Sequence, residues 1–396
     1  MDKHNHWLLP EGIEEVLPPE AERLDALCRA ALDQFRAWGY ERVMPPLLEY
    51  LETLLGGTGE DVALQSFKVT DQLSGRMMGI RADMTPQMAR IDAHVLKRNA
   101  PTRLCYLGTV LHTRPRSQGG TRAPLQVGAE LYGHAGPESD AEILALMLRT
   151  LQLAGLREVH VDLGHAGIFR GLTRGMQLAP AQEQELFDAL QRKSAAELET
   201  SIRDWGLTAK LGDPLLRLVE LNGDAAVLDE ARRVLAGAGD EVRQCLDNLA
   251  RIAELVRRQV RDAPLYFDLA ELDGYHYHTG MMFSTYVAGE GQGIAFGGRY
   301  DDIGAAFGRR RPGTGFSTDM NLLFALAPRE ATARDAIHAP ASEVPGLAEM
   351  IEQLRRQGEV VICELPGHDG ELRAMGCGRE LILDKGRWTV RKIDAR

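Results

Sequence analysis

The spacing of hydrophobic positions along the chain separates expected helices from expected strands. In residues 20–38 apolar side chains recur every three or four positions, which predicts an amphipathic helix that ends at Gly39. Residues 139–154 repeat this pattern more strongly. Segments 103–108 and 126–132 alternate between apolar and other residues, which favours strands.

The segment between the first helix and these strands is rich in turn signals. Residues 42–50 indicate a strand that is closed by a Pro-Pro turn. Segments 68–70 and 76–80 predict a hairpin around Ser74-Gly75. Thr85-Pro86 is expected to open a helix that runs to about residue 95, with Thr85 as N-cap and Pro86 as its first residue.

A long helical stretch follows the strand predicted at 159–163. Residues 167–262 carry several helical patterns and little strand signal, so we interpret them as a helical insertion. Strands return at 265–269, 281–288 and 293–296, and residues 320–326 predict a helix.

The last part of the chain has a different composition. Residues 328–345 are charged and contain Ala and Pro, which indicates a linker after a first domain of residues 1–327. Residues 346–396 predict a small α/β domain. Its expected elements are helices at 347–357 and 370–375 and strands at 359–364, 381–383 and 388–393.

Composition narrows the protein class. Hydrophobic residues make up 44% and charged residues 26%, as in ordinary globular proteins. The net charge of -11 disfavours nucleic-acid binding, because such affinity comes mainly from neutralising phosphates. Apolar runs of the ~20 residues that span a bilayer, and a secretory signal, are both missing, so the cytoplasm is the expected compartment. Five cysteines without a C-x-x-C pair indicate reduced thiols.

Several short motifs stand in a defined order along the chain. The segment 272–280 reads Leu-Asp-Gly-Tyr-His-Tyr-His-Thr-Gly. It is preceded by Arg-Ala-Asp-Met-Thr at 81–85 and by the segment 108–130. Gly-Gly-Arg-Tyr-Asp follows at 297–301, and Gly-Thr-Gly-Phe-Ser at 313–317. Their order and spacing over roughly residues 7–325 resemble the histidyl-tRNA synthetases, a far more specific match than one short motif gives.

The resemblance implies a histidine pocket. In those enzymes an acid, a Thr and a Gln hold the α-amino group, and the matching residues are Asp83, Thr85 and Gln126. The residue that reads the imidazole corresponds to Glu130. A carboxylate can accept from an ammonium or an imidazole N–H, so the residue types suit the task. Three further residues are expected to line the ring: Tyr275, Tyr277 and His278.

The positions that handle ATP in the synthetases have changed. The arginine of segment 272–280 is replaced by Asp273, the α-phosphate arginine by His112, the adenine-reading acid by Arg114 and the γ-phosphate arginine by Leu322. Each lost charge-assisted contact removes roughly 1.5–3 kcal/mol. Several losses together are expected to abolish activation. Arg114 and Arg122 are candidates for a residual anion contact.

The C-terminal part is also too short for the anticodon-binding domain of the synthetases. A retained histidine pocket, altered ATP positions and a short tail resemble the regulatory subunits of ATP phosphoribosyltransferase. This resemblance implies a non-catalytic protein without cofactor that partners a short-form catalytic subunit and takes L-histidine as effector. It also implies a homodimer within a hetero-octamer, and feedback inhibition of the first step of histidine biosynthesis.

The resemblance implies an α+β fold like that of class II aminoacyl-tRNA synthetases. We expect a mixed, mainly antiparallel sheet of six or seven strands, with flanking helices, the helical insertion and the small tail. Two other functions stay open at this point, a divergent histidyl-tRNA synthetase or other aminoacylating relative, and an RNA-binding sensor. Histidine could bind the inherited pocket or a subunit interface.

Two further patterns have ordinary interpretations. His276 and His278 share one face of an extended segment, but a third ligand is missing nearby, so we expect no metal site. The run Arg309-Arg310-Arg311 is interpreted as a solvated loop.

Overall fold

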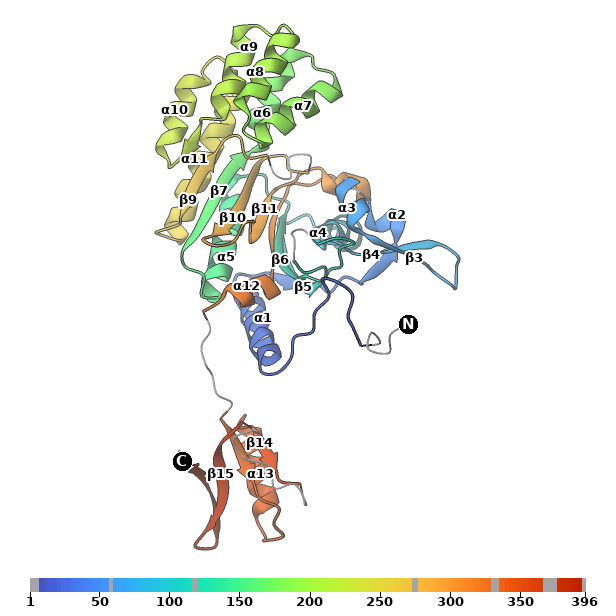
Figure 1. Cartoon of the computed structure of the whole chain (residues 1–396), viewed down its shortest axis with the longest axis vertical. Helices are drawn as coiled ribbons and strands as arrows, with labels where there is room; N and C mark the ends of the chain where they lie inside the picture. Colours follow the sequence, from blue (N-terminus) through green and yellow to red (C-terminus); the bar gives the residue numbers. More distant parts are fainter. Residues whose placement is uncertain are drawn as a thin grey trace. The chain divides into compact units, whose positions relative to one another are not determined.

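The computed structural model describes residues 7–56, 60–115, 120–272, 277–328, 335–365 and 376–393 (Figure 1). The chain divides into two compact units, Met1–Ala327 and Pro328–Arg396. Among the described residues, none of the helices is long and apolar enough to cross a membrane.

A mixed sheet forms the centre of the first unit. Within the described residues it has nine strands in the order β1-β5-β6-β12-β11-β10-β7-β9-β8. The pairs β1–β5 and β7–β9 are parallel, and the other neighbours are antiparallel. The strand bounds are β1 Glu41–Arg42, β5 Thr102–Thr109, β6 Leu125–Tyr132, β7 Val159–His165, β8 Asn222–Gly223, β9 Leu265–Asp268, β10 Met281–Val287, β11 Ala295–Arg299 and β12 Gly313–Asp319.

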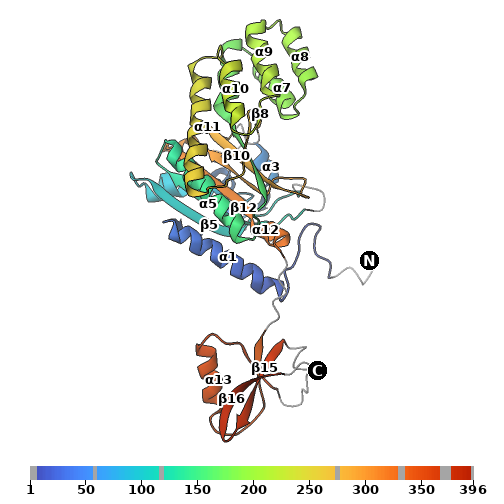
Figure 2. The same cartoon turned by 90° about the vertical axis from the view of Figure 1, so that its left-hand side faces the viewer.

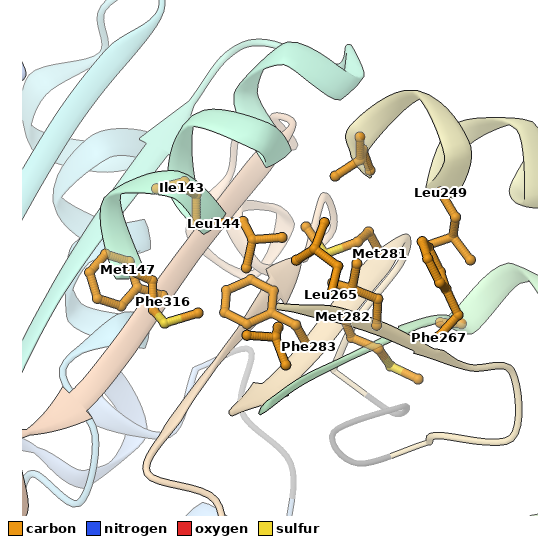
Figure 3. Packing of buried hydrophobic residues seen from close by; sticks show 14 of the residues in the cluster. Ile143, Leu144, Met147, Leu249, Leu265, Phe267, Met281, Met282, Phe283 and Phe316 are labelled. Atoms are coloured by element: carbon orange, nitrogen blue, oxygen red, sulfur yellow. The ribbon is translucent and has the colours of Figure 1, made fainter. Parts of the chain in front are cut away.

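Three helices cover one face of this sheet: α1 (Glu20–Ala37), α5 (Pro137–Leu153) and α12 (Met320–Leu326) (Figure 2). The predicted apolar stripe of α1 is its buried side. Burying these apolar faces against the sheet is the main stabilising contribution. Figure 3 shows Ile143, Leu144 and Met147 of α5 packed near Phe283 and Phe316 of the sheet.

The opposite face carries a second, smaller core. The chain also forms a separate three-stranded antiparallel sheet in the order β2 (Leu48–Tyr50), β4 (Met77–Ile80) and β3 (Phe67–Thr70), counted over the described residues. Helices α2 (Leu51–Leu54) and α3 (Glu60–Gln65) connect β2 to β3 along the chain. Helix α4 (Thr85–Arg90) continues directly into a π-helix, Ile91–Leu96. This core contains Met84, Met88, Leu104, Tyr106, Tyr132 and Tyr300.

The helical insertion lies between the parallel strands β7 and β9. It contains the expected α-helices and also the short strand β8, which was not predicted, and its helices gather at one end of the strands (Figure 1). The helix bounds are α6 Ala166–Thr173, α7 Pro180–Gln191, α8 Ala195–Asp204, α9 Ala209–Leu218, α10 Ala226–Val234 and α11 Asp240–Gln259.

The second unit is a small α/β unit. Its described part has a four-stranded sheet in the order β14-β13-β15-β16, with helix α13 (Leu347–Arg356) contributing to the same small core. The strand bounds are β13 Ala336–Ala339, β14 Val361–Cys363, β15 Cys377–Asp384 and β16 Arg387–Lys392. The predicted helix at 370–375 falls outside the described residues.

Several details differ from the sequence prediction. The main sheet has nine described strands where six or seven were expected, because β8 and β12 also join it. Residues 336–339, expected in a linker, form β13 in the interior of the second unit's sheet. Residues 42–50 form two short strands, β1 and β2, in different sheets. Strand β12 was not predicted, because its glycines break the apolar alternation. Thr85 is not the N-cap of α4; the cap is Met84, and the Thr85 side chain is used in a hydrogen-bond cluster.

The arginine run was also misjudged at one position. Arg311 is only 7% exposed, and it donates to Asp92 Oδ1 at 2.7 Å and to Thr102 Oγ1 at 3.3 Å. Its neighbour Arg310 is exposed and forms a surface ion pair with Asp302. The loop is therefore solvated at Arg310 and buried at Arg311.

Candidate functional site

The site is built on strand β6, where side chains alternate between the two faces of the sheet. Val127, Ala129 and Leu131 point into the main core. The intervening residues 126, 128, 130 and 132 therefore lie on the opposite face, along one line on the strand. Antiparallel pairing places Gly315 of β12 opposite Glu130, and Asp319 opposite Gln126. The predicted residues Gln126 and Glu130 thus share one face, four positions apart.

Glu130 is a buried carboxylate held by two tyrosines. Tyr106 donates its hydroxyl to Glu130 Oε1 at 3.1 Å, and Tyr300 donates to Oε2. Burial raises the pKa of Glu130 well above its usual range, and the hydrogen bonds from Tyr300 and Tyr106 oppose this rise. An acceptor in such a position can read an N–H group of a ligand.

Asp83, Thr85 and Gln126 form a connected cluster. Asp83 Oδ1 accepts from the Gln126 amide at 2.8 Å, from the Thr85 backbone at 3.1 Å and from the Thr85 hydroxyl at 3.2 Å. The Thr85 and Tyr106 hydroxyls lie 3.2 Å apart, which links this cluster to Glu130. The structure therefore brings together the four residues predicted to hold the amino group and the imidazole.

Two glycines keep the surroundings of Glu130 open. A Cβ at Gly315 would lie 1.6 Å from Glu130 Oε2, and one at Gly128 would lie 2.4 Å from the Tyr106 hydroxyl. Any side chain at these positions would displace the carboxylate or the tyrosine. Within the motif at 313–317, the glycine at position 315 is therefore explained by its closeness to Glu130.

Tyr277 and His278 reach the same region. The Tyr277 and Tyr300 rings are 5.1 Å apart, and the Tyr277 hydroxyl is buried with no hydrogen-bond partner among the described residues. His278 Nδ1 is likewise buried and unpaired there, and burial lowers the pKa of His278 to about 4. Both atoms could pair with a polar ligand. Asp273, Tyr275 and His276 lie outside the described residues.

A pocket of about 420 Å³ adjoins this cluster at Gln126. His112 and Leu322 line it together with the apolar Phe296. Three carboxylates also line it, Glu14, Glu290 and Asp319, and the described lining residues include neither lysine nor arginine. The charge of this pocket is therefore opposite to what a polyphosphate requires.

Neither of the two candidate anion contacts is among the described lining residues of the pocket. Arg114 is exposed and is not among the described lining residues of the pocket. Arg122 donates to the carbonyls of His112 at 3.1 Å and Glu11 at 3.3 Å, and stacks over the Phe67 ring. Both stay unassigned as ligand contacts.

Tyr106 and Tyr300 were missed as site residues by the sequence analysis. Tyr300 follows the Gly-Gly-Arg of the motif at 297–301, and Tyr106 stands in an apolar strand, where it is easily interpreted as core. On β5, Leu104 stands opposite Glu130, and Tyr106 reaches the carboxylate diagonally from its place opposite Gly128. Groups of three or more potential metal ligands were not found in the described part of the chain.

Comparison with known proteins shows the family of the chain. The histidyl-tRNA synthetase family model matches residues 12–323, and the model of the C-terminal domain of ATP phosphoribosyltransferase subunit HisZ matches residues 334–391. An ATP phosphoribosyltransferase regulatory subunit from Thioalkalivibrio sulfidiphilus is 55% identical, covering 98% of this chain and 99% of its own length. A regulatory subunit from Alkalilimnicola ehrlichii is 52% identical, covering 99% of this chain and 98% of its own length.

Solved structures show the same architecture. An ATP phosphoribosyltransferase regulatory subunit/histidyl-tRNA synthetase from Bacillus halodurans matches with a TM-score of 0.82 and 27% identity, covering 93% of this chain and 96% of that one. Histidyl-tRNA synthetase from Nostoc shares the fold at a TM-score of 0.78 and 18% identity, covering 98% and 97%. The predicted class II synthetase-like fold is confirmed. The chain belongs to the family of ATP phosphoribosyltransferase regulatory subunits, which is built on the histidyl-tRNA synthetase fold.

Proposed function

We propose that this chain is a non-catalytic subunit that senses L-histidine and controls a short-form ATP phosphoribosyltransferase catalytic subunit. The observation that carries the proposal is the buried Glu130 carboxylate, held by Tyr106 and Tyr300 beside the Asp83–Thr85–Gln126 cluster. This arrangement offers acceptors for both an imidazole N–H and an ammonium group. Histidine carries both groups.

In this proposal the imidazole end of the ligand meets Glu130. Its N–H donates to the carboxylate, and the Tyr277 hydroxyl, buried and unpaired among the described residues, is available for a further polar contact. The ammonium end is placed at Asp83, Thr85 and Gln126. Tyr275 belongs to the proposed site by sequence position.

The adjoining pocket supports a role without ATP chemistry. A triphosphate in this pocket would meet Glu14, Glu290 and Asp319 where a synthetase needs cations. Asp273 in the sequence adds a further acidic residue at a position that is arginine in the synthetases. A robust ATP–pyrophosphate exchange signal with histidine would contradict the proposal and favour a divergent synthetase.

The partners of this subunit are proposed from the family. The relatives' name implies a catalytic ATP phosphoribosyltransferase chain. A homodimer within a hetero-octamer is the proposed assembly, in the cytoplasm. Exposed large apolar residues support self-association, because most of those described lie in the first 95 residues.

The experiment is a calorimetric titration of L-histidine into the purified protein, alone and with the short-form catalytic subunit. Binding to the isolated protein supports a sensor in the Glu130 pocket. Binding only in the complex moves the sensor to an interface. Absence of binding in both samples contradicts the function as proposed.

Glu130→Ala is the matching variant for this titration. Loss of a hydrogen bond to a charged group costs roughly 1.5–3 kcal/mol, so histidine affinity is expected to fall about 10-fold or more. Feedback inhibition of the complex should weaken in parallel, while complex formation is unchanged. Inhibition equal to that of the wild type would remove Glu130 from the site.

A further inference from the structure

The pocket lined by Glu14, Glu290 and Asp319, here called the acidic pocket, adjoins the proposed histidine site at Gln126. Gln126 marks the end of the site that holds the amino group of the ligand. Glu130 and Gln126 lie four residues apart on the same face of β6, and the Asp83, Thr85 and Tyr106 side chains link them through successive contacts of 2.8, 3.2, 3.2 and 3.1 Å. A histidine whose imidazole meets Glu130 and whose ammonium meets Asp83 and Gln126 has its α-carbon near the Gln126 end. Its carboxylate then faces the pocket, since Gln126 belongs to both the cluster and the pocket lining.

The charges at that end disfavour a carboxylate. Glu290 and Asp319 are half-buried and Glu14 is exposed, and all three line the pocket. The negative charge of Asp319 is partly compensated, because the backbone N–H groups of Leu125 and Asn321 donate to its Oδ1 at 2.9 and 3.0 Å. The described lining residues supply no cation to neutralise a ligand anion. The net charge of -11 adds a long-range potential of the same sign.

The pocket also has room for more than a carboxylate. Its volume of about 420 Å³ lies in the usual range of small-molecule pockets, and its walls combine amide and hydroxyl groups with the apolar Phe296 and Leu322. A neutral polar group on the carboxyl carbon of the ligand can hydrogen-bond to these walls without meeting a like charge.

We propose that this site prefers imidazole-bearing amines whose carboxyl end is neutral over L-histidine itself, and that Glu290 is a specificity-determining residue. The inference rests on the proposed function, because it uses the same site. Histidine still binds, but the like charges weaken its binding and so raise the concentration at which it is sensed.

The test compares L-histidine, L-histidinol and L-histidinamide by calorimetric titration into the full chain with its catalytic subunit. Histidinol and histidinamide are expected to bind at least about 5-fold more tightly than histidine, which corresponds to ~1 kcal/mol. The ratio of the affinity for each analogue to the affinity for histidine is expected to shrink as the salt concentration rises from about 0.05 M to about 0.5 M, because salt screens partly exposed charges. Histidine binding at least as tightly as both analogues would overturn the inference while leaving the proposed function intact.

Glu290→Gln tests whether Glu290 determines the ligand preference. Glu199→Gln is the control, because Glu199 is an exposed carboxylate on α8 that is not among the described lining residues of the pocket. Glu290→Gln should bind histidine about 3-fold more tightly and bring the histidinol-to-histidine ratio closer to one. The control should leave the ratio unchanged. An unchanged ratio in Glu290→Gln would remove Glu290 from the inference. A sample in which none of the three ligands binds overturns the proposed function as well.

Discussion

Glu130 shows at the scale of one residue how the proposed binding role and stability conflict. The carboxylate is 1% exposed, and the groups that hold it are tyrosine hydroxyls, which do not neutralise its charge. Burying a charge without a counter-ion is costly, so the folded protein holds the Glu130 proton more tightly than the unfolded chain does. The residue type is therefore better explained by a ligand than by stability.

This conflict gives a pH prediction. Because the pKa of Glu130 is raised in the folded state, its contribution to stability is full at low pH and declines as the pH rises above the ordinary value of about 4.5. Glu130→Gln removes this decline, so its melting temperature should fall less than that of the wild type between about pH 5 and pH 8. Thermal unfolding across this range, with Glu199→Gln as control, measures the difference. Parallel curves for Glu130→Gln and the wild type would mean that Glu130 keeps the same pKa on folding.

Gly315 gives a second residue-scale prediction. A methyl group at this position would lie 1.6 Å from Glu130 Oε2, with the Ala129 carbonyl 2.9 Å away, so the carboxylate must move. Gly315→Ala is expected to lower stability by about 1–3 kcal/mol and to weaken histidine binding strongly. Gly237→Ala is the control, because no described atom lies within 4 Å of the place that its methyl group would occupy. Chemical denaturation and titration of both variants decide the matter, and a Gly315→Ala protein that binds normally would show that the site is roomier than described.

At the scale of elements, the π-helix Ile91–Leu96 is anchored by a buried ion pair. Asp92, inside this helix, accepts from Arg311, and burial raises the pKa of Asp92 while Arg311 opposes the rise. Arg311 also donates to the Asn99 and Ala100 carbonyls after the helix. One side chain therefore connects the π-helix, its following loop and the start of β12.

Adjacent arginines provide a matched comparison of a buried and an exposed ion pair. Arg311→Ala removes the ion-pair partner of the buried Asp92, and it should cost about 3–5 kcal/mol at pH 8. Arg310→Ala removes only the surface pair with Asp302, and it should cost less than about 1 kcal/mol. Urea denaturation measures both. Part of the Arg311→Ala loss should be regained at pH 5, where Asp92 is more readily protonated, and equal losses in the two variants would contradict the burial argument.

Most elements could be predicted because their apolar faces repeat with the period of a helix or strand. The helix at α1 and the hairpin β3–β4 are examples. Strand β12 could not be predicted from that pattern, since Gly313 and Gly315 are selected by close contacts across the sheet. Tyr106 and Arg311 were missed for a related reason, because their partners Glu130 and Asp92 are distant in sequence. The motif resemblance singled out Asp83 and Glu130 as candidate site residues, which periodicity alone would not do.

At the scale of the whole molecule, apolar exposure is unevenly distributed. Met44 is 76% exposed and Leu48 is 42% exposed, whereas the described helices of the insertion contribute no large exposed apolar residue. An exposed apolar region of this kind favours self-association. The proposed homodimer would cover it.

This uneven exposure gives a prediction on assembly. Met44→Asp places a charge in the proposed interface and should shift the protein towards the monomer at micromolar concentration. Leu153→Asp is the control, because Leu153 is a 40% exposed residue at the end of α5, outside that region of the sequence. Light scattering after size-exclusion chromatography measures the masses. A Met44→Asp protein with the mass of the wild type would place the interface elsewhere.

The parallel pairing of β7 with β9 limits how far this fold can be reduced. The two strands are neighbours in the sheet, with Val161 opposite Leu265, yet they run in the same direction. A two-residue turn can join antiparallel neighbours only, and parallel strands need a crossover of roughly a dozen residues. A minimised version for biosensor engineering can therefore exchange the α6–α11 module for another helix, but it cannot delete the connection altogether.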